Sequence, residues 1–204
     1  MQLSICIPTY NRCDLLEATL GRLSDQILNF GLKSKVEIIV SDNCSTDGTQ
    51  SVVNSYSELG VKSIRHKANL GPDGNFFSLF EVADGDYIWV LGDDDSFSDD
   101  LIPFILDQIV IHSFDYLYLR KTGGPRISER VVDVVDVVTA EQLLARTGIT
   151  TTFITSQIIK STLVKSNLTR AKDFLDGMGY FHIYLDALFQ SKICLISRYK
   201  EIYA

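Results

Sequence analysis

Long hydrophobic segments are missing from this chain of 204 residues. Its apolar runs are about strand length, and none approaches the roughly 20 residues that a helix needs to cross a bilayer. The first residues, MQLSICIP, also lack a basic region and a cleavage site, so no export signal is expected. We therefore expect a cytoplasmic protein that at most touches the inner face of a membrane.

Paired cysteines and an excess of basic residues are absent as well. The four cysteines show no CxxC spacing, which favours reduced thiols. Lys and Arg number 19 against 26 Asp and Glu, giving a formal net charge of −7. Because a nucleic-acid surface normally needs a dense basic face, no nucleic-acid partner is expected. An acidic protein can still bind a nucleotide when a metal cation mediates the contact.

The first half of the chain contains a regular alternation of β-rich and helical segments. Strands are predicted at residues 3–8, 36–42, 61–66 and 86–91, and helices after Asn11, after the NCSTDGT turn, from about Pro72 and at 101–112. This order implies right-handed crossovers between parallel strands. The predicted fold is therefore α/β, with a mostly parallel central sheet flanked by helices on both faces.

The second half is less regular. The pattern predicts a strand at 114–119, a basic turn at 121–130, a strand at 131–138, a short helix at 139–146, a Thr-rich stretch at 147–156 and a long helix at 172–191. Residues 192–204 return to strand character and then stop abruptly, which is compatible with a longer natural chain. No internal repeat or low-complexity segment occurs, so we expect a single domain over residues 1–204.

Polar segments follow each of the first four predicted strands. They are TYNR (9–12), SDNCSTDGT (41–49), HKANLGPDGN (66–75) and GDDD (92–95). In open α/β sheets the ligand crevice lies outside the carboxyl ends of the strands. The four segments are therefore predicted to line one binding site.

Closely spaced aspartates mark the end of the fourth strand. They are Asp93, Asp94, Asp95, Asp99 and Asp100. At least two of the carboxylates of residues 93–95 are expected to lie on the same side, whether the strand continues through Asp95 or turns after Gly92. Closely spaced carboxylate oxygens are suitable ligands for Mg²⁺ or Mn²⁺. Such an ion usually fills its remaining positions with water and substrate phosphates. The alternative is a set of solvated acids at a helix start, which we favour for Asp99 and Asp100.

The end of the second strand carries a carboxylate and an amide, Asp42 and Asn43. Both can hydrogen-bond the polar edge of a nucleobase, and the alternative is an N-cap for the next helix. In the first segment, Tyr10 could stack on a base and Arg12 could meet a phosphate. Each of these two signals is weak alone.

Taken in order, four segments are similar to a known family. They are SICIPTYNR, VEIIVSDNCSTDGT, NLGPDGN and YIWVLGDDD. Together they resemble the nucleotide-binding half of the family 2 glycosyltransferases with the GT-A fold, over roughly residues 3–112. The resemblance implies an inverting sugar transfer from a nucleotide-sugar donor with a divalent metal at the diphosphate. It also implies that residues 1–112 bind the donor and residues 113–204 the acceptor.

Roles for single residues follow from the same resemblance. Donor-binding positions are Pro8, Thr9, Tyr10, Arg12, Asp42, Asn43, Asn69, Gly71, Asp93 and Asp94, and the implied metal ligands are Asp94 and Asp95. Many members carry an acid where this chain has Gly92, so the assignment within 93–95 stays open. The Q-x-x-R-W segment of processive members is absent, which favours a single addition.

An inverting displacement also needs a general base for the acceptor hydroxyl. No Glu-Asp dipeptide, which the family often uses, occurs after residue 112. Asp186 is the best candidate, because it shares a helix face with His182; the alternative is two ordinary surface residues. Asp173 and Asp176 are further candidates for the base. A separate set of basic residues could bind phosphate or an anionic acceptor: Lys121, Arg126 and Arg130. The alternative for these three is a solvated loop.

The predicted function is metal-assisted transfer of a sugar from a UDP-, GDP-, CDP- or dTDP-sugar to a hydroxyl group. The expected acceptor is a glycan or lipid-linked saccharide in lipopolysaccharide O-antigen or capsule assembly, since the finer similarity is to bacterial transferases of that type, including abequosyltransferase-like enzymes. Two alternatives remain. A sugar-phosphate nucleotidyltransferase would need a Gly-rich, basic loop where this chain has TYNRCD. A non-catalytic module would bind the nucleotide-sugar without turnover.

Overall fold

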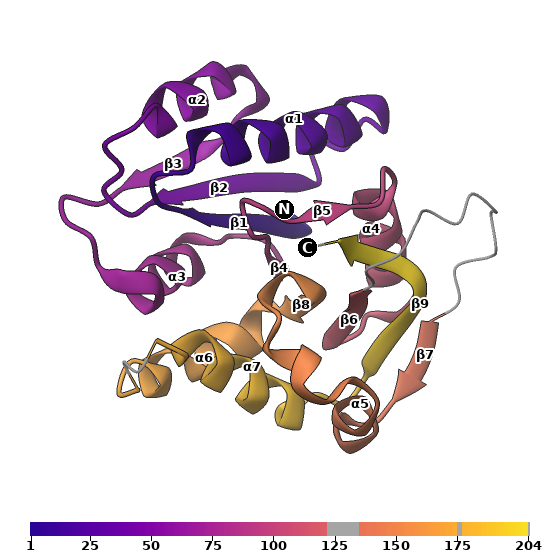
Figure 1. Ribbon diagram of the computed structural model, residues 1–204. Helices are drawn as coiled ribbons and strands as arrows, with labels where there is room; N and C mark the ends of the chain where they lie inside the picture. The colour runs from indigo at the N-terminus through magenta and orange to yellow at the C-terminus, as the bar shows by residue number, and fades with distance from the viewer. Residues whose placement is uncertain (122–134, 175–176, 204) are drawn as a thin grey trace.

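A central sheet with helices on both faces forms the body of the protein (Figure 1). The computed structural model describes residues 1–121, 135–174 and 177–203. Within these residues the strand order is β3-β2-β1-β4-β8-β6-β9-β5, and β7 pairs with β9 off this path. The predicted α/β class is confirmed.

Parallel pairing joins the first four strands of this order. They are β1 (Leu3–Thr9), β2 (Val36–Asp42), β3 (Lys62–Arg65) and β4 (Tyr87–Val90). The register places Thr9 beside Asp42 and Asp42 beside Arg65, so the carboxyl ends of β1, β2 and β3 lie together. The predicted rim of strand ends is therefore present.

Beyond β4 the sheet is mixed, which differs from the mostly parallel sheet predicted. The remaining strands are β5 (Ser96–Phe97), β6 (Tyr116–Lys121), β7 (Val135–Val138), β8 (Gln157–Lys160) and β9 (Cys194–Tyr203). β8 runs antiparallel between β4 and β6, β9 is parallel to β6, and β5 and β7 are antiparallel to β9. The insertion of β8, which the sequence pattern did not predict, reverses the strand direction at the middle of the sheet.

Seven helices and three 3₁₀ turns connect the strands in the described residues. The helices are α1 (Cys13–Asn29), α2 (Thr49–Ser55), α3 (Gly71–Val82), α4 (Leu101–His112), α5 (Ala140–Thr147), α6 (Ser161–Ala171) and α7 (Gly179–Gln190), and the turns are Ser57–Leu59, Gly148–Thr152 and Ile154–Ser156. Over the ranges that the structure describes, every helix is too short or too polar to cross a membrane.

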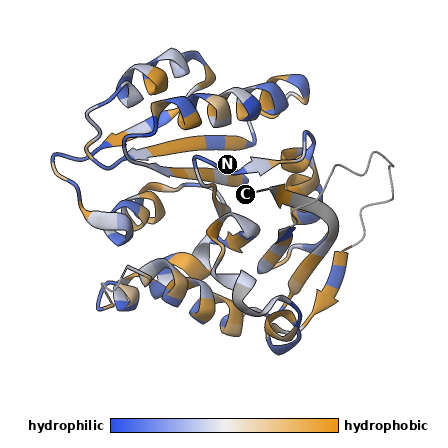
Figure 2. Cartoon of the chain, viewed as in Figure 1, coloured by the Kyte–Doolittle hydropathy of each residue, from blue (hydrophilic) through white to orange (hydrophobic). Residues whose placement is uncertain are grey.

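The two faces of the sheet bury separate cores because successive strand side chains point in opposite directions. Leu3, Ile5 and Ile7 of β1 pack in a core with α1 and α4, whereas Cys6 packs in a second core with α3, α6 and α7. Figure 2 shows β1 and β2 as hydrophobic along most of their length, with hydrophilic residues on the outer surfaces of α1 and α2. A fully buried sheet of this kind fixes the strand ends, where the polar segments lie.

The predicted long helix at 172–191 is wrong. Helix α6, which was not predicted, ends at Ala171, and α7 begins only at Gly179. Gly177 lies between them with a φ of 84°, a left-handed conformation that interrupts a helix. The division of the chain into one domain with halves 1–112 and 113–204 stays a prediction.

Candidate functional site

A cleft of about 490 Å³ opens at the carboxyl ends of β1, β2 and β4 and at the start of α3. Nine predicted site residues line it: Pro8, Thr9, Tyr10, Arg12, Asn43, Asn69, Gly71, Asp93 and Asp94. Pro72, Asn75, Phe76, Gly92 and Ile154 complete the lining. The four polar segments therefore meet in one place, as their position after parallel strands indicated.

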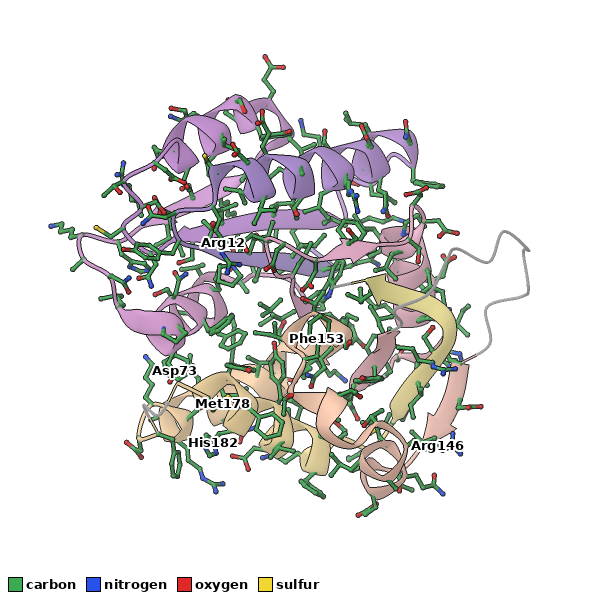
Figure 3. All side chains as sticks on the ribbon, in the orientation of Figure 1. Arg12, Asp73, Arg146, Phe153, Met178 and His182 are labelled. Atoms are coloured by element: carbon green, nitrogen blue, oxygen red, sulfur yellow. The ribbon has the colours of Figure 1, made fainter. Side chains whose placement is uncertain are left out.

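The Arg12 guanidinium lies between two of the clustered aspartates, near the centre of Figure 3. Its Nη1 atom is 3.0 Å from Asp93 Oδ1 and 3.0 Å from Asp94 Oδ2. Asp93 also accepts a hydrogen bond of 2.8 Å from the Thr9 hydroxyl. Burial raises the pKa of Asp93, and the bonds from Thr9 and Arg12 oppose that rise. In the described structure, Arg12 is thus the cation that offsets the repulsion between these carboxylates.

Asp94 is the aspartate best placed to hold a metal ion. It lines the cleft and its side chain is 51% exposed, whereas Asp95 is buried and accepts a hydrogen bond from the Thr155 hydroxyl. No group of three His, Cys, Asp or Glu side chains gathers in the parts of the chain that the structure describes. This donor set fits Mg²⁺ or Mn²⁺ held by one or two carboxylates and completed by water and phosphate oxygens. The ligand role of Asp95 stays a prediction.

Asp42 does not line the cleft; it is buried at the end of β2 beside Thr9, and one of its carboxylate oxygens accepts no hydrogen bond. Its Oδ1 accepts a hydrogen bond of 2.8 Å from the Ser45 backbone N–H. Its Oδ2 has no hydrogen-bond partner among the described residues, and Arg65 Nε lies 3.6 Å away. A buried carboxylate oxygen without a donor is costly, so a ligand N–H would be bound favourably there. Asp42 does not cap α2, because the N-cap residue of that helix is Gly48.

Asn43 holds the loop that leads into α3. Its side-chain N–H groups donate to Asn69 Oδ1 and the Gly71 carbonyl, and its Oδ1 accepts from the Leu70 backbone N–H. Gly71 has a φ of 72°, which a glycine adopts without strain. This arrangement fixes the wall of the cleft formed by Asn69 and Gly71. A direct contact between Asn43 and a nucleobase stays a prediction.

Several residues at the site escaped the sequence analysis. The Thr155 hydroxyl accepts from the Gly92 backbone N–H at 2.9 Å and donates to Asp95, while Thr19 donates to the Asp93 carbonyl. Thr155 belongs to the Thr-rich stretch that was noted without a role. Phe76 and Ile154 give the cleft apolar walls, and no periodicity marks them as distinct from core residues.

The predicted general base does not line the cleft. Asp186 lies on α7, and its Oδ2 is 3.3 Å from Arg170 Nη1 on α6. His182 stacks on Phe174 with 4.6 Å between the ring centroids. Asp173 is exposed and is also not among the cleft residues. The other predicted candidates, Asp176, Arg126, Arg130 and the side chain of Lys121, lie outside the described residues.

A comparison with protein families decides the identity of the chain. The model of the family described as Glycosyl transferase family 2 matches residues 4–123. The chain belongs to glycosyl transferase family 2. The match spans the four motif segments and every cleft residue except Ile154, and it confirms the resemblance that the motifs indicated.

Among curated family relatives, abequosyltransferase RfbV of Salmonella typhimurium is 38% identical over 128 residues. That alignment covers 61% of this chain and 37% of RfbV, so the chain spans well under half the length of this relative. A glucosyltransferase of Campylobacter jejuni, named for a diphosphate-undecaprenol-linked acceptor, is 28% identical over 60% of this chain and 40% of its own length.

Solved structures share the fold at lower identity. Residues 1–349 of Staphylococcus aureus TarS in complex with UDP superpose with a TM-score of 0.78 at 20% identity, covering 100% of this chain and 61% of that one. The mannosyltransferase PcManGT of Pyrobaculum calidifontis, in complex with GDP-Man and Mn²⁺, gives a TM-score of 0.60 at 16% identity, covering 81% and 46%. These likenesses confirm the predicted GT-A fold.

Proposed function

We propose that this protein is an inverting glycosyltransferase that moves a sugar from a nucleotide-diphosphate donor to a hydroxyl acceptor. The observation that carries the proposal is the cleft, because the four motif segments of a family 2 member converge there. They bring together the buried Asp93, the half-exposed Asp94 and Arg12. The similarity to RfbV and to the Campylobacter glucosyltransferase supports a place in O-antigen or capsule assembly. Cytoplasmic location and peripheral membrane contact are part of the same proposal.

The donor base would bind at the ends of β1 and β2. Asp42 Oδ2, which is ion-paired with Arg65 but accepts no hydrogen bond, would accept an N–H from the base edge. Tyr10, which is 45% exposed, would stack on the ring. Asn43 and Asn69 would keep the neighbouring loop in place. UDP, GDP, CDP and dTDP each present an N–H on the base, so the base identity is left to experiment.

The diphosphate would lie at Arg12 and Asp94, with Asp93 toward the ribose. Asp94, with Asp95 as a second candidate, would hold a Mg²⁺ or Mn²⁺ ion, in line with the Mn²⁺ present in the PcManGT complex. A bound divalent ion neutralises charge on a leaving diphosphate. Arg12 would supply a further positive charge on the leaving side, and Phe76 and Ile154 would keep bulk water from the sugar.

The acceptor hydroxyl must lose a proton as the new bond forms. Asp186 is not proposed as the base, because its carboxylate forms an ion pair with Arg170 and the residue does not line the cleft. A sugar-phosphate nucleotidyltransferase is disfavoured, since the loop after β1 carries TYNRCD rather than a Gly-rich basic loop. A binding module without turnover is the alternative that the experiment must separate.

The first prediction is that one nucleoside diphosphate stabilises the protein only when Mn²⁺ or Mg²⁺ is present. At 100 times its dissociation constant a ligand adds about 2.7 kcal/mol of stability. That increment raises the melting temperature of a chain this size by roughly 5 to 10 °C. Thermal-shift measurements with UDP, GDP, CDP and dTDP, each with and without metal, identify the base.

Two variants make this experiment decisive. Asp94→Asn should lose the metal-dependent part of the stabilisation, whereas Asp107→Asn, which removes an exposed carboxylate from α4, should keep it. Release of the free nucleoside diphosphate from the matching nucleotide-sugar, lost in Asp94→Asn, separates an enzyme from a binding module. Indifference of the wild-type protein to every nucleotide with metal would contradict the proposal.

A further inference from the structure

A second cavity, of about 330 Å³, lies between β6, β7, α5 and β9. Its polar lining in the described residues comprises Tyr118, Arg120, Asp136, Arg146, Thr147, Thr150 and Ser197. Figure 3 shows Arg146 beside α5, well away from Arg12 at the cleft. No residue lines both cavities, so the second cavity is separate from the proposed donor site.

Positive charge is in excess in this second cavity. Arg146 Nη1 lies 3.1 Å from Asp136 Oδ2, which pairs one guanidinium with the carboxylate that the described residues contribute to the lining. The Arg120 side chain makes no hydrogen bond or ion pair with any residue in the described ranges. Two guanidinium groups and one carboxylate leave one net positive charge. Arg120 therefore offers a full set of N–H donors to an anion.

The other polar atoms of the cavity are acceptors. The Tyr118 hydroxyl donates to Thr150 Oγ1 at 2.7 Å, Thr150 Oγ1 donates to the Thr147 carbonyl at 2.6 Å, and Thr147 Oγ1 donates to the Leu143 carbonyl at 2.8 Å. Each of these hydroxyl protons is thus used within the protein. The hydroxyl oxygens can still accept hydrogen bonds from a ligand.

Part of the lining of this cavity is buried. Tyr118 is 2% exposed and Ser197 is 1% exposed, and both belong to the lining, together with the exposed Arg120 and Arg146. A planar guanidinium matches phosphate oxygens in a bidentate manner, and the exposed guanidinium groups of Arg120 and Arg146 can be reached by an anion from solvent. The volume lies at the lower end of the range for small-molecule sites, which fits a group of monosaccharide size.

We propose that this cavity binds a phosphorylated saccharide, with the phosphate on Arg120 and Arg146 and sugar hydroxyls on Asp136, Thr147 and Thr150. The donor and acceptor groups of the lining are those that such a ligand requires. The assignment does not depend on the donor cleft or on its metal. Inorganic phosphate shares the anionic part of this chemistry but lacks the hydroxyl donors, so the two ligands are distinguishable.

Calorimetric titration with glucose 1-phosphate, inorganic phosphate and glucose at constant ionic strength tests the assignment. We expect glucose 1-phosphate to bind more tightly than phosphate, and glucose not to bind. Arg120→Gln should weaken glucose 1-phosphate binding at least tenfold, and Arg120→Lys, which keeps the charge and loses the planar fork, should lie between. Arg22→Gln, which removes an exposed arginine from α1, is the matched control and should bind as the wild type does.

The cleft supplies an internal reference for the same variants. Arg120→Gln should keep the stabilisation by nucleoside diphosphate with Mn²⁺, which shows that the variant is folded, and Arg12→Gln should keep glucose 1-phosphate binding. Unchanged affinity in Arg120→Gln would overturn the site. Equal affinity for inorganic phosphate and glucose 1-phosphate would overturn the saccharide part of the assignment.

Discussion

Asp47 shows how one side chain on the surface holds two loops of the cleft together. Its Oδ2 accepts from the Cys13 backbone N–H at the start of α1, and its Oδ1 accepts from the backbone N–H and hydroxyl of Thr49 at the start of α2. The helix predicted after Asn11 is α1, and its N-cap residue is Arg12, without a side-chain bond. A single carboxylate therefore serves the first turns of both helices.

Acid should weaken this contact only at a pH below that at which an exposed acid of ordinary pKa is protonated. The hydrogen bond from the Thr49 hydroxyl is the largest cause that lowers the pKa of Asp47 from 3.8 to about 2; burial opposes it, and the backbone N–H groups of Cys13 and Thr49 lower the pKa further. A carboxyl whose pKa is lower in the folded state stabilises the fold above its unfolded pKa of about 3.9 and loses that contribution as the pH falls toward 2. We therefore expect Asp47→Asn to destabilise the protein at pH 6 and to do so less at pH 3.

Urea unfolding of wild type and variant at both pH values measures the difference. Asp107→Asn controls for the loss of one surface charge, because that residue lies exposed on α4. A loss of stability in Asp47→Asn that is the same at pH 3 as at pH 6 would show that the Asp47 carboxylate is not held by these bonds.

At the scale of elements, the start of α7 depends on a carboxylate from α3. Asp73 is 5% exposed, and its two oxygens accept the backbone N–H groups of Gly177 and Gly179 at 2.8 Å each. Figure 3 shows Asp73 close to Met178, the residue that separates Gly177 from Gly179 in the sequence. Since the first N–H groups of a helix have no partner within the helix, Asp73 performs the task of an N-cap from a different element.

Removing this carboxylate should loosen α7. We expect Asp73→Ala to lower the free energy of unfolding by about 2 kcal/mol, because one buried N–H and one partly buried N–H lose their acceptor. Asp73→Asn keeps the shape and one acceptor oxygen, so it should cost less. Amide hydrogen exchange at Gly179 measures the local effect, and exchange that is equally slow in wild type and Asp73→Ala would refute the cross-element cap.

Elements set by local pattern were predictable, and those set by distant contacts were not. The predicted bounds of β2 and α4 agree with the structure, because continuous burial and an uninterrupted apolar pattern determine them. The helix predicted at 172–191 was wrong at its beginning, because the break before α7 is held by a residue 106 positions earlier. The order of the first strands predicted that Thr9, Arg12 and Asp93 would lie together. Thr155 was not predictable in this way. It lies directly before β8, and no local sequence pattern indicates that β8 inserts antiparallel beside β4.

At the scale of the whole molecule, the described parts of residues 1–112 and 113–204 share one sheet and are hydrogen-bonded to each other at Thr155. β4 of the first half pairs with β8 of the second, and β5 pairs with β9. Trp89 is fully buried on β4, and its indole N–H donates to the Thr155 carbonyl at 2.7 Å. The Thr155 hydroxyl in turn bonds to Gly92 and Asp95. The aspartate loop of the cleft is therefore anchored by the second half of the chain.

The two halves should consequently unfold together. Trp89 is the only tryptophan, so its fluorescence reports the junction, while far-ultraviolet circular dichroism reports the helices of both halves. We expect the two signals to show one coincident transition in urea. Thr155→Val should shift both by the same amount, about 2 kcal/mol, because the Gly92 N–H loses its acceptor and the buried Asp95 loses the hydrogen bond from this hydroxyl. Thr155→Ser keeps the hydroxyl and should shift neither appreciably. Two separate transitions, with only the fluorescence signal responding to Thr155→Val, would mean that the halves are independent domains and that the cleft geometry does not require residues 113–204.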